Sequence, residues 1–344
     1  MKIAHVVWGM CTGGIETMLV NIINEHVKTE DVRLYIINDF VDEDIVRCIS
    51  NKCKIYRLNR KPGSRNPIGI LKLNLWLMSY NPDIVHVHSH NVSRLILGNR
   101  NIVRTIHGID NPPYEYPRMK ALYAISNAVK EFTINQGFPD VIEVDNGIRV
   151  EDVMKKPGQK PQDGVYKLVQ LGRMYTPHKG QDLLVRALAI LLRKGVKNFK
   201  MHFIGDGPSM EEVKELSDSM GLKDYIVFEG SKTQEEVYQQ LCEYDVFVQP
   251  SKSEGFGLTV AEAVAAKLPV LVSNLPGPME VIGNGLWGMS FETENVEDLA
   301  AKLEIILKGG YDYSLVDKAY KRAVELYDVR VTAKKYIEEY KKII

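Results

Sequence analysis

Two glutamates, Glu254 and Glu262, flank a stretch whose composition suits anion binding. An apolar run that ends at Pro250 predicts a buried strand, and the glycines after it predict a loop. The pattern then becomes helical, which places Glu254 in the loop and Glu262 about one turn into the helix. The amides at the start of a helix have no intrahelical acceptor and attract anions. Here they belong to Gly257, Leu258 and Thr259.

A phosphate bound at this helix start would have one carboxylate on each side. Because a carboxylate repels a phosphate, Glu254 and Glu262 are better suited to binding hydroxyl groups. A phosphate between two hydroxyl-rich groups describes a nucleotide sugar, with the ribose on one side and a second sugar on the other. The alternative is that both glutamates are solvated surface residues, as charged side chains usually are. The strand, glycine loop and helix around them favour the ligand site.

The run from Pro250 to Gly257, with the sequence PSKSEGFG, is followed by Glu262-Ala263. It resembles the signature of the retaining glycosyltransferases of family 4, the group 1 enzymes, in which two glutamates are separated by seven residues. The resemblance implies an α/β protein with the GT-B fold, in which two Rossmann-like, doubly wound parallel-sheet domains face a central cleft. Glu254 would then hold hydroxyls of the transferred sugar, and Glu262 would hold the ribose.

The resemblance also implies a reaction. A hexosyl group would move from a UDP- or GDP-linked sugar to a hydroxyl of a glycan or lipid-linked acceptor, with retention of anomeric configuration. Such enzymes build cell-surface polysaccharide, including capsule and lipopolysaccharide. Two rival hypotheses stay open at this point. One is a nucleotide-sugar epimerase of GT-B-like fold, and the other is a non-catalytic protein that binds nucleotide sugars.

Two basic residues, Arg173 and Lys179, follow the first predicted strand of the second half of the chain. At the mouth of a cleft they would neutralise a diphosphate leaving group, Arg173 as a planar fork and Lys179 as a point charge. A loop arginine and lysine are more often solvated. The frame Gly-Arg followed by Lys-Gly resembles the diphosphate clamp of the family. With that clamp, we expect no metal and no cofactor beside the nucleotide sugar.

Several glycines end strand-like runs and would let a ligand approach the backbone closely. The turn GMCTGG after the first strand resembles the N-terminal loop of the family, although an ordinary strand-to-helix turn would have the same composition. Two later strand ends resemble the segments that lie near the nucleotide. The donor-binding residues predicted in these turns are Gly13, Gly14, Gly205, Gly230 and Ser231.

Histidines gather at His86, His88 and His90, and His107 follows the next strand. Alternate residues of a strand share a face, so the first three would point the same way. We favour burial and cleft lining for them over a metal site. The resemblance places His107 beside the transferred sugar, as a catalytic contact. His88 and Glu16 are expected on the acceptor side.

Length and composition set further bounds. A chain of 344 residues suits two domains, and a formal net charge of zero does not suggest nucleic-acid binding. Four scattered cysteines favour neither disulfides nor a zinc site. Neither a cleavable signal pattern nor a long apolar span is evident, so we expect a cytoplasmic protein. The sequence specifies no oligomeric state.

Short apolar strands alternate with helical patterns twice, which indicates two doubly wound parallel sheets. The predicted domains are 1–150, on the acceptor side, and 165–327, which binds the nucleotide sugar. A polar segment rich in proline and glycine, 151–164, would link them. We expect the last helix, 328–344, to pack back on the first domain, as it does in the family.

One loop of the first half is crowded with basic residues, Arg60, Lys61 and Arg65, and precedes the apolar helical pattern 67–80. Basic residues beside an apolar helix can dock on anionic lipid. This predicts a peripheral contact with the inner face of a membrane. The alternative is that the helix only packs on its own sheet.

Overall fold

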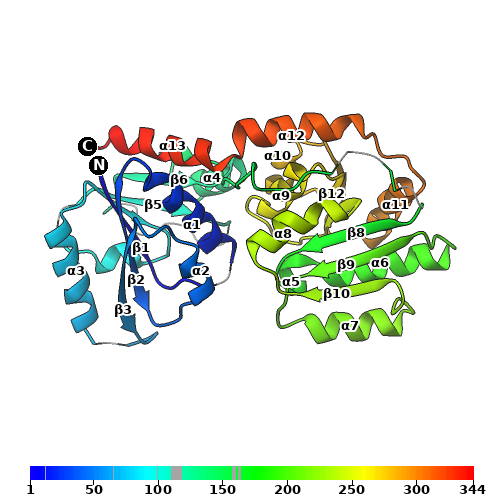
Figure 1. The fold of residues 1–344 in the computed structure, drawn as a ribbon, viewed down its shortest axis with the longest axis horizontal. Helices are drawn as coiled ribbons and strands as arrows, with labels where there is room; N and C mark the ends of the chain where they lie inside the picture. The colour runs from blue at the N-terminus through cyan, green and yellow to red at the C-terminus, as the bar shows by residue number, and fades with distance from the viewer. Residues whose placement is uncertain (12, 65, 99, 110–117, 157–159, 162–163) are drawn as a thin grey trace. The chain divides into compact units, whose positions relative to one another are not determined.

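A computed structural model describes the chain except for a few short segments, and it divides into two compact α/β units (Figure 1). The described residues are 1–11, 13–64, 66–98, 100–109, 118–156, 160–161 and 164–344. Arg65 of the basic loop and part of the predicted linker therefore lie outside them. The first unit comprises Met1–Ile148 with Leu326–Ile344, and the second comprises Arg149–Glu325.

The first unit is built on a parallel seven-stranded sheet with the order β3-β2-β1-β4-β5-β6-β7. Its strands are short and largely apolar, as expected for a sheet covered on both faces. They are β1 (Lys2–Val7), β2 (Asp31–Asn38), β3 (Lys54–Arg60), β4 (Ile84–Val87), β5 (Ile102–Ile106), β6 (Ala121–Ala124) and β7 (Val141–Glu143).

Helices cover both faces of this sheet (Figure 1). They are α1 (Gly14–His26), α2 (Glu43–Arg47), α3 (Ile68–Tyr80), the 3₁₀ helix η1 (Val92–Leu95), α4 (Asn127–Asn135) and α13 (Val329–Lys341). Successive residues of β1 face opposite sides. Ala4 and Val6 pack in the core beneath α3, whereas His5 stacks on His26 of α1. The C-terminal helix α13 packs on α1 within this unit.

The second unit repeats the plan with a parallel six-stranded sheet in the order β10-β9-β8-β11-β12-β13. Its strands are β8 (Tyr166–Leu171), β9 (Phe199–Ile204), β10 (Ile226–Gly230), β11 (Val246–Gln249), β12 (Val270–Ser273) and β13 (Met289–Phe291). Two doubly wound parallel sheets confirm the predicted fold class. The strand β13, which has three residues, was not predicted from the sequence.

The helices of the second unit include two short ones that the sequence did not predict, α5 (Thr176–Lys179) and α10 (Pro276–Val281). The others are α6 (Gln181–Arg193), α7 (Met210–Ser219), α8 (Gln234–Gln240), η3 (Leu241–Glu243), α9 (Leu258–Ala265), α11 (Val296–Leu307) and α12 (Ser314–Leu326). A large apolar cluster between α6, α11 and the sheet forms the core of this unit.

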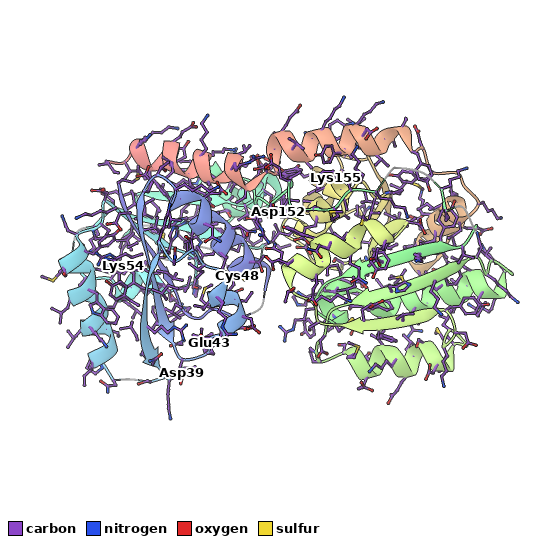
Figure 2. The ribbon with its side chains drawn as sticks, viewed as in Figure 1. Asp39, Glu43, Cys48, Lys54, Asp152 and Lys155 are labelled. Carbon is purple, nitrogen blue, oxygen red and sulfur yellow. The ribbon has the colours of Figure 1, made fainter. Side chains whose placement is uncertain are left out.

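The beginning of the segment predicted as a linker, 151–164, belongs to the second unit. Figure 2 labels two of its side chains, Asp152 and Lys155. Asp152 Oδ2 lies 3.1 Å from Arg149 Nη1, and Lys155 Nζ donates to the carbonyl of Val153 at 3.2 Å. The chain is therefore held by local contacts directly after it enters this unit.

Candidate active site

Glycines end the first three strands of the second unit in conformations that other residues rarely adopt. Gly172, Gly205 and Gly230 have φ of 149°, 131° and 73°. The amide of Gly205 donates to the carbonyl of Gly230 at 2.8 Å, and a Cβ added at Gly205 would lie 2.1 Å from the carbonyl oxygen of Gly172. Ser231, which follows, is exposed. At Gly205 the turns therefore pack so closely that only a residue without a side chain fits. Ligands of such sheets bind at this edge.

Arg173 follows the first of these turns and is exposed. Its carbonyl accepts a hydrogen bond from Nε2 of the fully buried Gln181, at 3.0 Å. Its guanidinium lies 5.8 Å from the centre of the Tyr175 ring. The backbone of Arg173 is therefore fixed while its charged end stays available to an anionic ligand.

Lys179 ends α5, directly before the left-handed Gly180, whose φ is 63°. The carbonyl of Lys179 accepts from Gln170 Nε2 at 3.1 Å. A Cβ added at Gly180 would lie 1.9 Å from the carbonyl oxygen of Pro250, so the α5 turn and the loop after β11 are in contact through glycine. The sequence gives no sign of this contact, because the two segments are far apart along the chain.

That contact brings Lys179 and Glu254 together. Lys179 Nζ lies 2.6 Å from Glu254 Oε2, across a separation of 75 residues. The glutamate's loop is held in place by its backbone, since the amides of Lys252 and Ser253 donate to the carbonyl of His178 at 2.8 and 3.3 Å. The structure therefore joins Glu254, which is predicted to bind the sugar, and Lys179, which is predicted to bind the diphosphate, in one ion pair.

The predicted anion site lies at the start of α9. Gly257 is the residue before the helix and has φ of 104°, which favours glycine. Its carbonyl accepts from the amides of Val260 and Ala261 at 3.0 and 3.1 Å, so the helix begins directly after it. Leu258 and Thr259 form the first turn, whose amides point out of the helix end. Eight residues from Leu258 to Ala265 give this end the partial positive charge of a helix N-terminus.

Glu262 lies one turn further and is buried, with 8% of its surface exposed. Burial raises the pKa of its carboxyl group to about 7, against hydrogen bonds from Gln234 and Tyr238 and the charge of Arg149, which lower it. These partners also bind one another, because Gln234 donates to the Tyr238 hydroxyl at 3.0 Å and Arg149 donates to Gln234 at 3.1 Å. This network could not be predicted from the sequence, because no local motif indicates it.

In the first unit, the predicted glycine turn caps α1. Gly13 is the residue before the helix and Gly14 is its first residue. The side chain of Glu16 folds back over the turn, since a Cβ added at Gly13 would lie 2.8 Å from Glu16 Oε2. Burial raises the pKa of the Glu16 carboxyl group. Gly13 and Gly14 therefore offer backbone without side chains, with one half-buried carboxyl group beside them.

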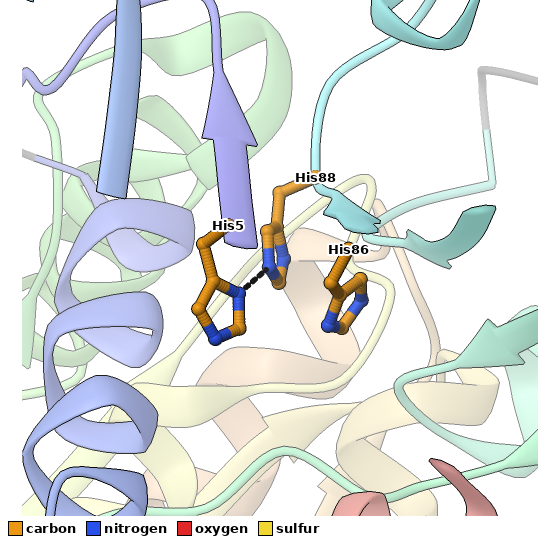
Figure 3. A group of neighbouring side chains, drawn as sticks. All are labelled: His5, His86 and His88. Carbon is orange, nitrogen blue, oxygen red and sulfur yellow. Dashed lines mark hydrogen bonds between the residues drawn. The ribbon is translucent and has the colours of Figure 1, made fainter. Parts of the chain in front are cut away.

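The histidines form a buried cluster in the first unit, but not the one that their spacing predicts. Figure 3 shows His5, His86 and His88 together, with ring nitrogens within 4.8 Å of one another. His90 is not part of this group and lies further beyond the end of β4 at Val87. His5 joins it because β1 and β4 are neighbouring strands on which His5 pairs with His86.

Hydroxyl groups occupy both ring nitrogens of His86. Its Nδ1 lies 2.6 Å from the Tyr340 hydroxyl and its Nε2 lies 2.8 Å from Thr105 Oγ1. Three neutral imidazoles are potential metal ligands, and burial lowers the pKa of each of them. A metal ion could bind His86 only if His86 gave up one of these two hydrogen bonds.

The cluster continues to His107, the predicted catalytic histidine at the end of β5. His5 Nδ1 lies 2.9 Å from His88 Nε2, and His88 Nδ1 lies 3.4 Å from His107 Nε2. Burial, with the nearby charge of Arg104, lowers the pKa of His107 to about 3. His107 is therefore neutral at physiological pH, and His88 is its immediate neighbour. Contact of either residue with a substrate stays a prediction.

Comparison with known proteins settles the family. The model of the glycosyl transferases group 1 matches residues 154–324, and the model of glycosyltransferase family 4 matches residues 12–152. The chain belongs to the group 1 glycosyltransferases. The two matches together contain every candidate residue of both units, from Gly13 to Glu262.

Relatives of this group 1 glycosyltransferase include the lipopolysaccharide 1,6-galactosyltransferase of Escherichia coli, which is 24% identical over 320 residues, or 86% of each chain. An uncharacterized glycosyltransferase of Methanocaldococcus jannaschii is 26% identical over 257 residues. That match covers 74% of this chain and 62% of the archaeal protein, so it spans less than two thirds of that relative.

Among solved structures, the Anabaena protein HepE in complex with UDP superposes with a TM-score of 0.82. The match covers 99% of this chain and 100% of HepE, at 18% identity. This likeness confirms the GT-B fold.

Proposed function

We propose that the protein transfers a hexosyl group from a UDP- or GDP-linked sugar to a hydroxyl of a glycan or lipid-linked acceptor, with retention of anomeric configuration. The reaction would serve cell-surface polysaccharide, of the lipopolysaccharide or capsule type, on the cytoplasmic side of a membrane. Support comes from the lipopolysaccharide galactosyltransferase relative and from HepE, whose structures include a complex with UDP-glucose.

The observation that carries this proposal is the Lys179–Glu254 ion pair beside the start of α9. A cation and a helix N-terminus on one sheet edge suit the diphosphate of a nucleotide sugar, and the carboxylate beside them suits the hydroxyls of its sugar. When a donor binds, Lys179 exchanges its carboxylate partner for the diphosphate. Glu254 is then free to accept hydrogen bonds from the hydroxyls of the transferred sugar.

We assign the remaining donor contacts as follows. Arg173 and the amides of Gly257, Leu258 and Thr259 bind the diphosphate, and Glu262 binds the ribose hydroxyls. The backbone at Gly205, Gly230 and Ser231 receives the base. In the first unit, Gly13, Gly14 and His107 contact the donor, and Glu16 and His88 serve the acceptor.

The chemical step needs no nucleophile from the protein. The bond between the anomeric carbon and the phosphate oxygen breaks as the acceptor oxygen attacks from the same face. The leaving phosphate oxygen takes the acceptor proton. Catalysis then consists of positioning and of stabilising the negative charge that develops on the diphosphate, the task of Arg173, Lys179 and the helix start. No step in this scheme requires a metal ion.

A thermal-shift screen of nucleoside diphosphates and their sugars tests the proposal, because a selective ligand stabilises the folded state by mass action. We expect one base to be preferred, followed by transfer of that sugar to an added acceptor. Conversion of the free donor to an epimer without acceptor would indicate an epimerase instead. Binding without any transfer or hydrolysis across an acceptor screen would indicate a non-catalytic binding protein.

A further inference from the structure

Helix α3 exposes a row of large apolar side chains. Ile68, Leu71, Leu75 and Met78 are 66%, 54%, 63% and 65% exposed, and we call them the α3 face. Their spacing of three and four residues places them on one side of the helix. A surface helix of a globular protein normally presents polar residues on its outer side, so this face requires an explanation.

The opposite side of α3 is already used for packing. Leu73, Leu77 and Tyr80 are buried in the core of the first unit, against alternate residues of β1 and β2. Figure 1 shows α3 on one face of the first sheet and α1 on the other. The sheet therefore needs only one side of α3, and packing within this unit does not account for the α3 face.

The sequence that leads into and through α3 is strongly basic. Residues 45–82 contain eight Lys and Arg residues and neither Asp nor Glu. The basic residues are Arg47, Lys52, Lys54, Arg57, Arg60, Lys61, Arg65 and Lys72. Glu43 and Asp44, just before this stretch, pair with Arg57 and Arg47. The charges nearest to α3 are left without such an acidic neighbour in the sequence.

Two of these charges adjoin the α3 face directly. Lys72 is exposed on the same side of the helix, with Nζ 4.6 Å from the centre of the Trp76 ring. Arg60 lies beside the first turn of α3, since a Cβ added at Gly69 would lie 3.8 Å from Arg60 Cδ. The exposed Lys61 follows it. The result is an apolar row flanked by positive charge.

We propose that the α3 face is a docking surface for an anionic lipid bilayer, with α3 lying in the plane of the interface. Apolar side chains enter the acyl boundary, and the basic residues meet lipid headgroups. A second copy of this chain is a poorer occupant, because a two-fold contact through this face would bring two basic segments together. Among the described residues no helix is long and apolar enough to cross a bilayer, so the contact is peripheral.

The inference rests on the proposed function only for its purpose, which is to bring the enzyme to a lipid-linked acceptor. Binding is measured without donor or acceptor, by sedimentation of the intact protein with vesicles. One set is phosphatidylcholine, and in the other about a third of the lipid is phosphatidylglycerol. We expect sedimentation with the anionic vesicles alone, and its loss at high salt, because surface charges are screened.

Matched variants separate the apolar and charged contributions. L71S with L75S removes two side chains of the α3 face and should lower partitioning about tenfold. K61Q with K72Q should lower it about fivefold for each charge. The control is L286S in the second unit, where the side chain is 66% exposed, at least as much as Leu71 and Leu75, and it should bind as the unaltered protein does.

Three results with vesicles would overturn the inference. They are equal binding to both kinds of vesicle, binding that L71S with L75S leaves unchanged, and no binding to anionic vesicles at low salt. Self-association that L71S with L75S abolishes would show the face to be a protein interface instead. Because these residues are exposed, the variants should fold, and transfer to a water-soluble acceptor should persist in them. If the unaltered protein does not transfer sugar to the water-soluble acceptor, that result would count against the proposed function and not against docking.

Discussion

The carboxyl groups of Glu254 and Glu262 have the same chemistry but different surroundings. Glu254 is paired with the partly exposed Lys179, whereas Glu262 is buried among Gln234, Tyr238 and Arg149. Glu254 can therefore change partners when a ligand arrives, and Glu262 is held in one orientation. This difference suits a residue that contacts the reacting sugar and a residue that contacts the ribose.

Replacing each glutamate by glutamine should separate these roles. E262Q should mainly weaken donor binding, because a ribose contact is the same in the ground and transition states. E254Q should lower kcat more than it raises the Kd for the nucleoside diphosphate, because its partner is the reacting sugar. Calorimetric titration and steady-state kinetics measure the two quantities. Equal losses of nucleoside diphosphate affinity in both variants would argue against the division.

The buried carboxyl group of Glu262 also predicts a pH dependence. Its pKa of about 7 means that it becomes ionised as the pH rises through neutrality. The carboxylate accepts stronger hydrogen bonds from the ribose hydroxyls than the neutral acid, so donor affinity should rise across this range. A nucleotide sugar should serve as the probe, because its diphosphate does not titrate there. E262Q should give a flat profile, and a flat profile in the unaltered protein would contradict the assignment.

At the scale of elements, turns without side chains position the site. The α5 turn passes so close to the loop after β11 that a Cβ at Gly180 would lie 1.9 Å from the Pro250 carbonyl. G180A should therefore cost about 3 kcal/mol of unfolding free energy or more and should displace Lys179. Gly195 also has a positive φ but has no atom within 4 Å of an added Cβ. G195A should cost only about 1 kcal/mol. Equal stability losses in denaturant melts would refute the argument.

These elements also show what the sequence could reveal. The strand, glycine loop and helix around Glu254 were predictable, because hydrophobic period and turn residues are local signals. The Lys179–Glu254 pair was not, because it depends on how two segments 75 residues apart meet at the sheet edge. His5 was missed for the same reason, since sheet order and not spacing brings it to His86.

At the scale of the molecule, the buried histidines predict sensitivity to acid. Burial lowers the pKa of His5, His86 and His88 in the folded protein below the ordinary value of 6.5. Below that pH the unfolded chain binds protons that the folded chain does not, so stability falls as the pH falls through about 6.5. Below this pH, each histidine that the fold keeps neutral lowers the free energy of unfolding by about 1.4 kcal/mol per pH unit.

Tryptophan fluorescence can locate this effect. Trp8 and Trp76 lie in the first unit and Trp287 lies in the second, so W287F reports on the first unit alone. Urea unfolding of W287F should give a free energy that falls steeply between neutral and mildly acidic pH. Adding H5Q should reduce the dependence of the unfolding free energy on pH by the equivalent of about one bound proton. A free energy that stays constant over this range would show that the histidines titrate normally.

The central claim is sugar transfer from a nucleotide sugar through the charged site of the second unit. It is tested most directly by measuring release of nucleoside diphosphate from the preferred donor, with and without a lipid-linked acceptor, in the presence of EDTA. The result predicted is acceptor-dependent release, a product of unchanged anomeric configuration, and a loss of about 100-fold or more in R173A. Release that EDTA abolishes and one metal restores, an inverted product, or unchanged turnover in R173A would contradict it.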